Sequence, residues 1–138
     1  KPLIAWAIEE AKKSKYIDWL IVSTEDEEIR YVSQQFGADV PFLRPKELAE
    51  DHSESVDVLL HAIQMFPEYE WVVQLQPTSP FRSVIDIDSS FEFATKHKFE
   101  SVIAITSAEK SPYWYFRKLE NQRIKSKYLN GYRYMGSM

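Results

Sequence analysis

Short apolar runs alternate with amphipathic stretches along this chain, and that alternation constrains the fold more than any other feature. Apolar runs bounded by turn-forming residues are typical of strands buried on both faces of a parallel sheet. Between the runs, apolar residues recur at helical spacing, as in helices that cover a sheet. Right-handed crossovers join strands and helices in this order. We therefore predict an α/β fold: a Rossmann-like three-layer sandwich with a mainly parallel sheet.

The predicted elements follow one another without an internal repeat or a glycine-rich linker, so residues 1–138 are expected to form a single domain. Helices are predicted at about residues 3–14, 26–36, 55–66 and 86–97. Strands are predicted at residues 19–24, 40–43, 71–75 and 101–106, and a hairpin at residues 113–128. Gly37 is predicted to end the second helix.

Charge and composition exclude several classes of function. The formal net charge is −4, whereas nucleic-acid binding needs a basic patch, so no nucleic acid is expected as a partner. No segment approaches the roughly 20 apolar residues of a membrane span, so no membrane is expected either. The chain has no cysteine and hence no disulfide or thiolate metal site. No signal peptide is recognised, and a cytoplasmic location is expected.

Two polar segments follow predicted strands, at residues 44–55 and at residues 76–82. The second is a turn bracketed by two prolines, which hold it stiff. In a parallel sheet both segments open on the carboxyl edge, where such folds bind ligands. Arg44 and Arg82 can each bind a phosphate or a carboxylate in a bidentate way. The arrangement suits a nucleotide or an acidic sugar.

Amide and hydroxyl groups complete the candidate binding set. Gln76 offers an amide, and Thr78 and Ser79 offer hydroxyls beside it. Ser53 or Ser55, near a helix N-terminus, can add a hydroxyl and backbone N–H groups to an anion. The alternative is that one of these two serines only caps a helix, that the arginines are surface residues and that the prolines merely shape a loop.

Acidic and aromatic clusters elsewhere favour structural roles. Asp86 and Asp88 are two residues apart and do not share a helix face, so a helix cap or first-turn acid is favoured over a metal pair. Residues 25–28 are read as a solvated, acid-rich first turn. The aromatic residues 113–116 fit a core or dimer surface better than a sugar pocket, although both readings stay open.

Five ordered blocks of sequence point to a family. They are Lys1-Pro-Leu-Ile-Ala-Trp6, Val22-Ser-Thr24, Phe36-Gly-Ala-Asp-Val-Pro-Phe-Leu-Arg-Pro45, residues 51–57, and Leu75-Gln-Pro-Thr-Ser-Pro-Phe-Arg82. Over about residues 1–112 the chain resembles the acylneuraminate cytidylyltransferases, also called CMP-sialic acid synthetases. The resemblance implies a fold of the nucleotide-diphospho-sugar transferase type.

The resemblance also implies an activity: transfer of CMP from CTP to N-acetylneuraminate or a related nonulosonic acid, with release of pyrophosphate and with Mg²⁺ as cofactor. It implies that Arg44 and Ser55 hold the cytidine end, with Ser53 nearby. It places Gln76 where nucleotide and acceptor sugar meet, with Thr78 and Ser79 beside it, and it allows a homodimer. The anomeric hydroxyl of the sugar would attack the α-phosphorus in line.

Two features expected from the resemblance have no counterpart in the sequence, namely a phosphate-cradling loop ahead of the first helix and metal-binding aspartates near the C-terminus of the family. We therefore expect a partial cytidylyltransferase domain that binds CTP weakly and turns over slowly or not at all. The alternative is a non-catalytic remnant that binds a nucleotide or a partner. A glycosyltransferase would need an Asp-x-Asp motif after a strand, and the only candidate, Asp86 to Asp88, precedes a helix.

Overall fold

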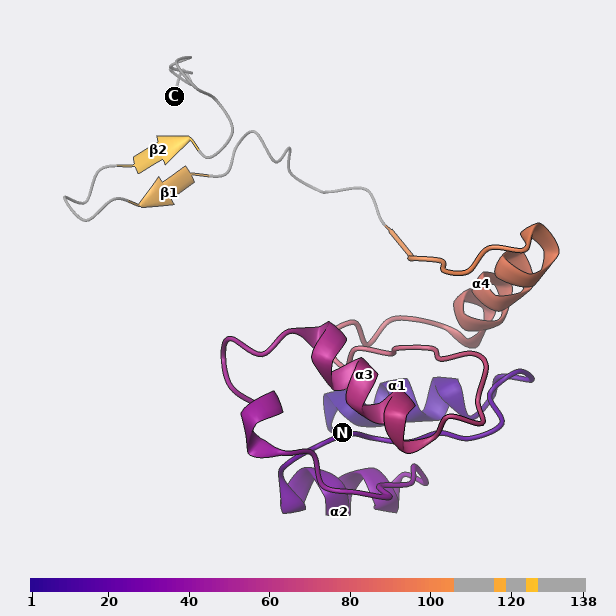
Figure 1. The fold of residues 1–138 in the computed structure, drawn as a ribbon, viewed down its shortest axis with the longest axis horizontal. Coiled ribbons are helices and arrows are strands. Elements are labelled where there is room, and N and C mark those ends of the chain that lie inside the picture. Colours follow the sequence, from indigo (N-terminus) through magenta and orange to yellow (C-terminus); the bar gives the residue numbers. More distant parts are fainter. Residues whose placement is uncertain (106–115, 119–123, 127–138) are drawn as a thin grey trace. The chain divides into compact units, whose positions relative to one another are not determined.

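A computed structural model describes residues 1–105, 116–118 and 124–126 (Figure 1). The chain divides into two compact units, Lys1–Val102 and Ile103–Met138. In the second unit, β1 (Phe116–Lys118) pairs with β2 (Ile124–Ser126) as an antiparallel hairpin. The predicted hairpin is thus confirmed over these residues. Residues 113–115 of the aromatic cluster lie outside the described part.

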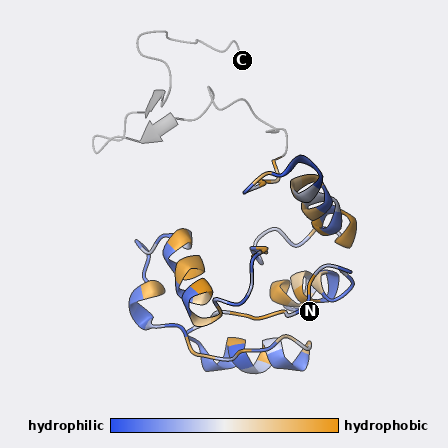
Figure 2. Cartoon of the chain, turned by 45° about the vertical axis from the view of Figure 1, so that its right-hand side comes forward, coloured by the Kyte–Doolittle hydropathy of each residue, from blue (hydrophilic) through white to orange (hydrophobic). Residues whose placement is uncertain are grey.

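The helices of the first unit occur where the sequence predicts them. Their bounds are α1 (Leu3–Ala11), α2 (Glu27–Gln35), α3 (Ser55–Met65) and α4 (Val84–His97), with a 3₁₀ turn, η1, at Lys46–Leu48. In Figure 2 these helices carry both hydrophobic (orange) and hydrophilic (blue) residues, as amphipathic helices do. No helix in the described residues is long and apolar enough to cross a membrane.

Local capping explains where α2 begins and ends. The Asp26 carboxylate accepts the backbone N–H groups of Glu28 and Ile29 at 2.8 and 2.9 Å. These bonds satisfy two of the N–H groups that the first turn of a helix leaves free. Just beyond the helix, Gly37 has a φ of +87° and donates its N–H to the Gln34 carbonyl. The prediction that Gly37 ends the helix is confirmed, because this left-handed conformation favours glycine.

Part of the predicted parallel pairing is present. Ile21 pairs with Asp39, and Thr24 pairs with Leu43, in two parallel bridges. The backbone N–H of Val22 donates to the Asp39 carbonyl at 2.8 Å. Residues 19–24 and 39–43 therefore run side by side in the same direction, which brings the residues that follow them to a common edge.

The predictions of strands at residues 71–75 and 101–106 are wrong for the residues that the structure describes. Residues 71–75 form neither a helix nor a strand, and among the described residues their backbone makes no hydrogen bond. Trp71, Val72 and Val73 are 40–47% exposed, not buried on both faces. The physical reason is that a strand requires a hydrogen-bonded neighbour, and an apolar run alone does not supply one.

Packing around α1 holds the first unit together. Helix α1 contacts both α2 and α4. The buried apolar side chains are small or β-branched, and they are Ala5, Ile8, Ala11, Ala38, Val40, Ile87 and Ala94. Aromatic contacts extend this core. Trp19 packs edge-on against Phe66 with ring centroids 4.6 Å apart, and Trp71 packs edge-on against Phe91 of α4 with ring centroids 5.5 Å apart. These contacts position the segments that line the candidate site.

Candidate functional site

An open cavity of about 990 Å³ lies within residues 1–102. Its apolar lining includes residues 19–22, residues 71–75 and side chains from α1, α3 and α4. Its polar lining includes Ser23, Thr24, Glu25, Arg44 and Gln76, and also Asp18, Glu68, Glu70 and Gln74. A concave apolar space with a few converging polar groups is the usual form of a small-molecule site.

The structure brings together Arg44 and Gln76, two of the residues predicted from the sequence to bind a substrate, in the lining of this cavity. They come from two loops that lie 32 positions apart in the chain, as their residue numbers show. The cavity lining does not include the other predicted site residues, which are Ser53, Ser55, Thr78, Ser79 and Arg82.

Arg44 is held by an ion pair that sequence reasoning missed. Its Nη2 donates to Oε2 of Glu25, and the two side chains are 19% and 32% exposed. The hydrogen bond from Arg44 lowers the pKa of the Glu25 carboxyl. Because Thr24 pairs with Leu43, the next residues of both segments, Glu25 and Arg44, leave side by side. The position of Glu25 directly after a predicted strand was the available signal.

Arg44 keeps hydrogen-bonding capacity beyond this pair. Its Nε is buried and has no hydrogen-bond partner among the described residues. A guanidinium carries five N–H donors, so the pair with Glu25 leaves several free. The site can therefore offer donors to an anion without first breaking the ion pair.

Neither Ser53 nor Ser55 caps α3 with its side chain. Ser53 donates its hydroxyl to the Glu47 carbonyl at 2.8 Å and accepts the Glu50 N–H at 3.2 Å, which closes the loop after η1. Ser55 is the first residue of α3, and the N-cap position is occupied by Glu54 without a side-chain bond. The alternative reading of Ser53 or Ser55 as an N-cap is therefore wrong, and a ligand-binding role for either stays a prediction.

The segment at residues 76–82, called the 76–82 turn below, is a turn as predicted. The Ser79 N–H donates to the Gln76 carbonyl at 3.1 Å. Thr78 and Ser79 are exposed, and Arg82 is half-buried. Arg82 helps to lower the pKa of the Asp86 carboxyl, although the hydrogen bonds from Ser83 contribute more. Arg82 thus acts on the first turn of α4, whereas Gln76 lines the cavity.

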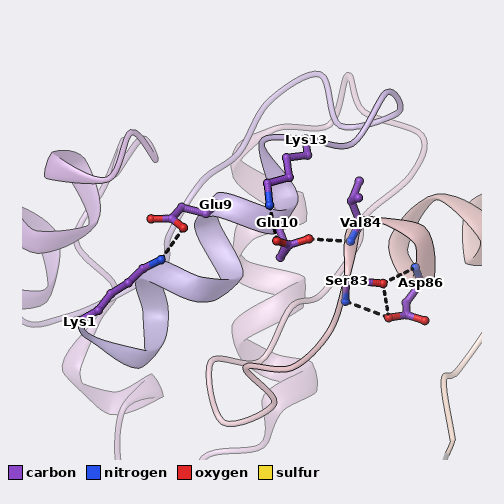
Figure 3. Close-up of polar contacts among 7 residues, drawn as sticks. All are labelled: Lys1, Glu9, Glu10, Lys13, Ser83, Val84 and Asp86. Carbon is purple, nitrogen blue, oxygen red and sulfur yellow. Dashed lines mark hydrogen bonds and ion pairs between the residues drawn. The ribbon is translucent and has the colours of Figure 1, made fainter.

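Helix α4 begins with a reciprocal cap (Figure 3). The Ser83 hydroxyl accepts the Asp86 N–H at 3.3 Å, and the Asp86 carboxylate accepts the Ser83 N–H at 2.8 Å. This is a capping box. Asp88 accepts the Ser14 hydroxyl at 2.5 Å. The prediction that Asp86 or Asp88 is a cap or first-turn acid is confirmed for Asp86.

The described residues contain no group of three or more His, Cys, Asp or Glu side chains placed to hold a metal ion. Magnesium is commonly bound by one or two carboxylates together with substrate phosphates. No reaction step is derived through the Mg²⁺ that the family resemblance implies.

Comparison with known proteins decides the family. The sequence profile of the family described as Cytidylyltransferase matches residues 1–127. This chain belongs to the cytidylyltransferase family. The resemblance inferred from the five sequence blocks is thereby confirmed.

Relatives in this family include three bacterial proteins. An N-acylneuraminate cytidylyltransferase of Escherichia coli O18:K1:H7 is 37% identical over 80% of this chain and 26% of its own length. A CMP-N,N'-diacetyllegionaminic acid synthase of Legionella pneumophila is 37% identical over 88% of this chain and 53% of its own length. A pseudaminic acid cytidylyltransferase of Campylobacter jejuni is 32% identical over 79% of this chain and 49% of its own length. The chain spans about half the length, or less, of these relatives.

Proposed function

We propose that this chain is part of an enzyme that transfers CMP from CTP to N-acetylneuraminate or a related nonulosonic acid and releases pyrophosphate. One observation carries the proposal: in a chain of the cytidylyltransferase family, Arg44 and Gln76 line the same cavity. The names of the relatives, which include a legionaminic acid synthase and a pseudaminic acid cytidylyltransferase, support a nonulosonic acid as acceptor.

In this proposal Arg44 binds the cytidine end of the nucleotide, with Ser53 on the neighbouring loop and Ser55 at the start of α3. Two observations support this role: a guanidinium has more donors than the pair with Glu25 uses, and Arg44 Nε has no hydrogen-bond partner in the described residues. The Glu25 carboxylate keeps the guanidinium oriented. An oriented guanidinium binds an oxygen acceptor at a lower entropic cost than a free one.

Gln76 marks the point where nucleotide and acceptor sugar meet, and Thr78, Ser79 and Arg82 supply further donors from the 76–82 turn. In-line attack of the anomeric hydroxyl on the α-phosphorus needs little covalent chemistry from the protein. Its contribution is to position both reactants and to stabilise charge. Gln76 suits this place because its amide offers donors and an acceptor at once.

Further features belong to the same proposal. A mainly parallel sheet of the nucleotide-diphospho-sugar transferase type is supported by the two parallel bridges between residues 19–24 and 39–43. Mg²⁺ as cofactor, a homodimer and a cytoplasmic location are expected from the family resemblance.

Binding of CTP to a conservative arginine variant tests the proposal. We expect calorimetry with CTP and MgCl₂ to show weak binding that Arg44→Lys reduces about tenfold, because lysine lacks the planar fork. Arg30→Lys is the matched control, since Arg30 also pairs with a nearby acid, Glu27, but does not line the cavity.

Two results would count against the proposal: no CTP binding by the unchanged chain, or equal losses in the two arginine variants. A pyrophosphate-release assay with N-acetylneuraminate, run beside the calorimetry, separates the remaining possibilities. Release of pyrophosphate indicates an active enzyme, whereas binding without release indicates a nucleotide-binding remnant of the fold.

A further inference from the structure

The start of α4 is bonded to another helix as well as to itself. The first turn of any helix leaves backbone N–H groups without an intrahelical acceptor. In α4 the capping box between Ser83 and Asp86 satisfies the N–H of Asp86. The N–H of Val84, the first residue of the helix, donates to Oε2 of Glu10 at 2.9 Å (Figure 3). Glu10 belongs to α1 and lies 74 positions earlier in the chain.

The Glu10 carboxylate is held from two sides. Its other oxygen, Oε1, accepts Lys13 Nζ at 2.5 Å, so each oxygen has its own donor (Figure 3). The Glu10 side chain is only 24% exposed. The hydrogen bonds from Lys13 and from the Val84 N–H lower the pKa of Glu10, so the group is ionised at neutral pH. A fixed negative charge is well placed at a helix N-terminus, because the helix dipole is positive there.

Other contacts between the α1 region and α4 fall on later turns of α4. The Ser14 hydroxyl donates to Asp88 at 2.5 Å, and the Tyr16 hydroxyl donates to Glu92 at 2.9 Å. In the described part of the chain, Glu10 is the residue of α1 whose side chain bonds to the backbone at the first turn of α4. Loss of Glu10 would therefore leave α4 bonded to residues 14 and 16 but would release its first turn from α1.

We propose that Glu10 is a positioning residue for the 76–82 turn. That turn ends at Arg82, directly before Ser83, and its two prolines restrict its backbone. Fixing Val84 therefore fixes the end of the turn, whose other end carries Gln76 in the cavity lining. This inference rests on the proposed function only in the claim that the turn binds substrate.

Three variants of Glu10 and one control test the inference. Glu10→Ala removes the acceptor, Glu10→Asp keeps the charge but shortens its reach, and Glu10→Gln keeps an acceptor oxygen at the same reach. Glu9→Ala is the matched control, because Glu9 is also an acid of α1 with a lysine partner, Lys1, but no bond to α4 among the described residues. Amide hydrogen exchange at residues 76–84 and CTP affinity are measured for each.

We expect Glu10→Ala and Glu10→Asp to speed exchange at Val84 about tenfold and to weaken CTP binding several-fold, because a bond to a charged acceptor is lost. Glu10→Gln should keep both the exchange rate at Val84 and the CTP affinity close to those of the unchanged chain. Glu9→Ala should change neither quantity. A purely structural role would instead lower thermal stability without changing CTP affinity. Equal exchange in Glu10→Ala and the unchanged chain, or an equal effect of Glu9→Ala, would overturn the proposal.

A variant at the donor keeps the test decisive if Glu10→Ala fails to fold. Val84→Pro removes the N–H at the first helical position, where proline is well tolerated. In that background Glu10→Asp should have no further effect on CTP affinity or on exchange in the turn, whereas an effect as large as in the unchanged chain would refute the link between Glu10 and Val84. If the unchanged chain does not bind CTP, the proposed function fails, and exchange in the turn still decides the role of Glu10.

Discussion

The lining of the cavity contains two apolar segments, residues 20–24 and residues 71–75, and they differ in how their backbones are bonded. Residues 20–24 exchange parallel hydrogen bonds with residues 39–44, and Thr24 is buried. Residues 71–75 make no backbone hydrogen bond in the described part of the chain, and Trp71 packs on Phe91 of α4 through its side chain alone. Two runs with similar strand propensity thus reach different states because one has a backbone partner.

This difference shows which parts of the site are anchored and how. Arg44 follows a paired segment and is held by Glu25, so backbone and side chain both orient it. Gln76 follows the unpaired segment, and its turn is anchored at the far end through Val84 and Glu10. The position of Arg44 is therefore expected to depend on the pairing of residues 20–24, and that of Gln76 on the contact between α1 and α4.

Proline substitutions should give the largest difference in stability between the two segments. Val22→Pro removes the N–H that donates to the Asp39 carbonyl and should cost about 3 kcal/mol of the free energy of unfolding. Val73→Pro removes no such bond and should cost less than about 1 kcal/mol. Urea denaturation of both variants measures the difference. Equal losses would show that residues 71–75 are paired in solution, as a wider parallel sheet requires.

Releasing Arg44 from its acid should have a smaller effect on the better-anchored side of the site. Glu25→Gln removes the charge that keeps the Arg44 guanidinium oriented, so CTP should bind about threefold more weakly. Glu27→Gln, which weakens the pair with Arg30 on α2, should leave affinity unchanged. Calorimetry at fixed ionic strength measures both. Tighter binding by Glu25→Gln would mean that Glu25 competes with the ligand for Arg44 more than it orients Arg44.

Lowering the pH should reduce the folding stability that Glu25 and Glu10 contribute, and the effect should be smallest near neutral pH. The pKa of Glu25 is lowered by Arg44, and the pKa of Glu10 is lowered by Lys13 and the Val84 N–H. A folded-state pKa below the unfolded value adds stability that is present above the ordinary value of 4.5 and is lost as the pH falls below it. Thermal melting should thus be nearly constant from about pH 7 to pH 5.5 and should fall below pH 4.5, less steeply in Glu10→Gln.

Much of the local structure could be predicted from the sequence because its signals act over a few residues. Asp26 at the start of α2 and Gly37 after its end are visible as cap residues, and both act on neighbours within three positions. The 76–82 turn was likewise predictable from its prolines. The family resemblance was available from the same ordered blocks that carry Arg44 and Gln76.

Features that depend on distant partners were not predictable in this way. The apolar run at residues 71–75 has the composition of a buried strand, yet its backbone lacks a neighbour in the described residues. Glu25 was read as a solvated acid of a first turn, whereas its partner Arg44 comes from another segment. No pattern around Glu10 shows that its carboxylate reaches Val84.

The sequence alone therefore determined the helices, their caps, the turn that carries Gln76 and the membership of the cytidylyltransferase family. Only the tertiary structure decided which apolar run is paired, that Glu25 holds Arg44, and that Glu10 bonds to the start of α4. The physical reason is the range of the interactions. Helix and cap hydrogen bonds join residues about four positions apart, whereas parallel pairing and ion pairs between segments depend on how distant parts of the chain pack.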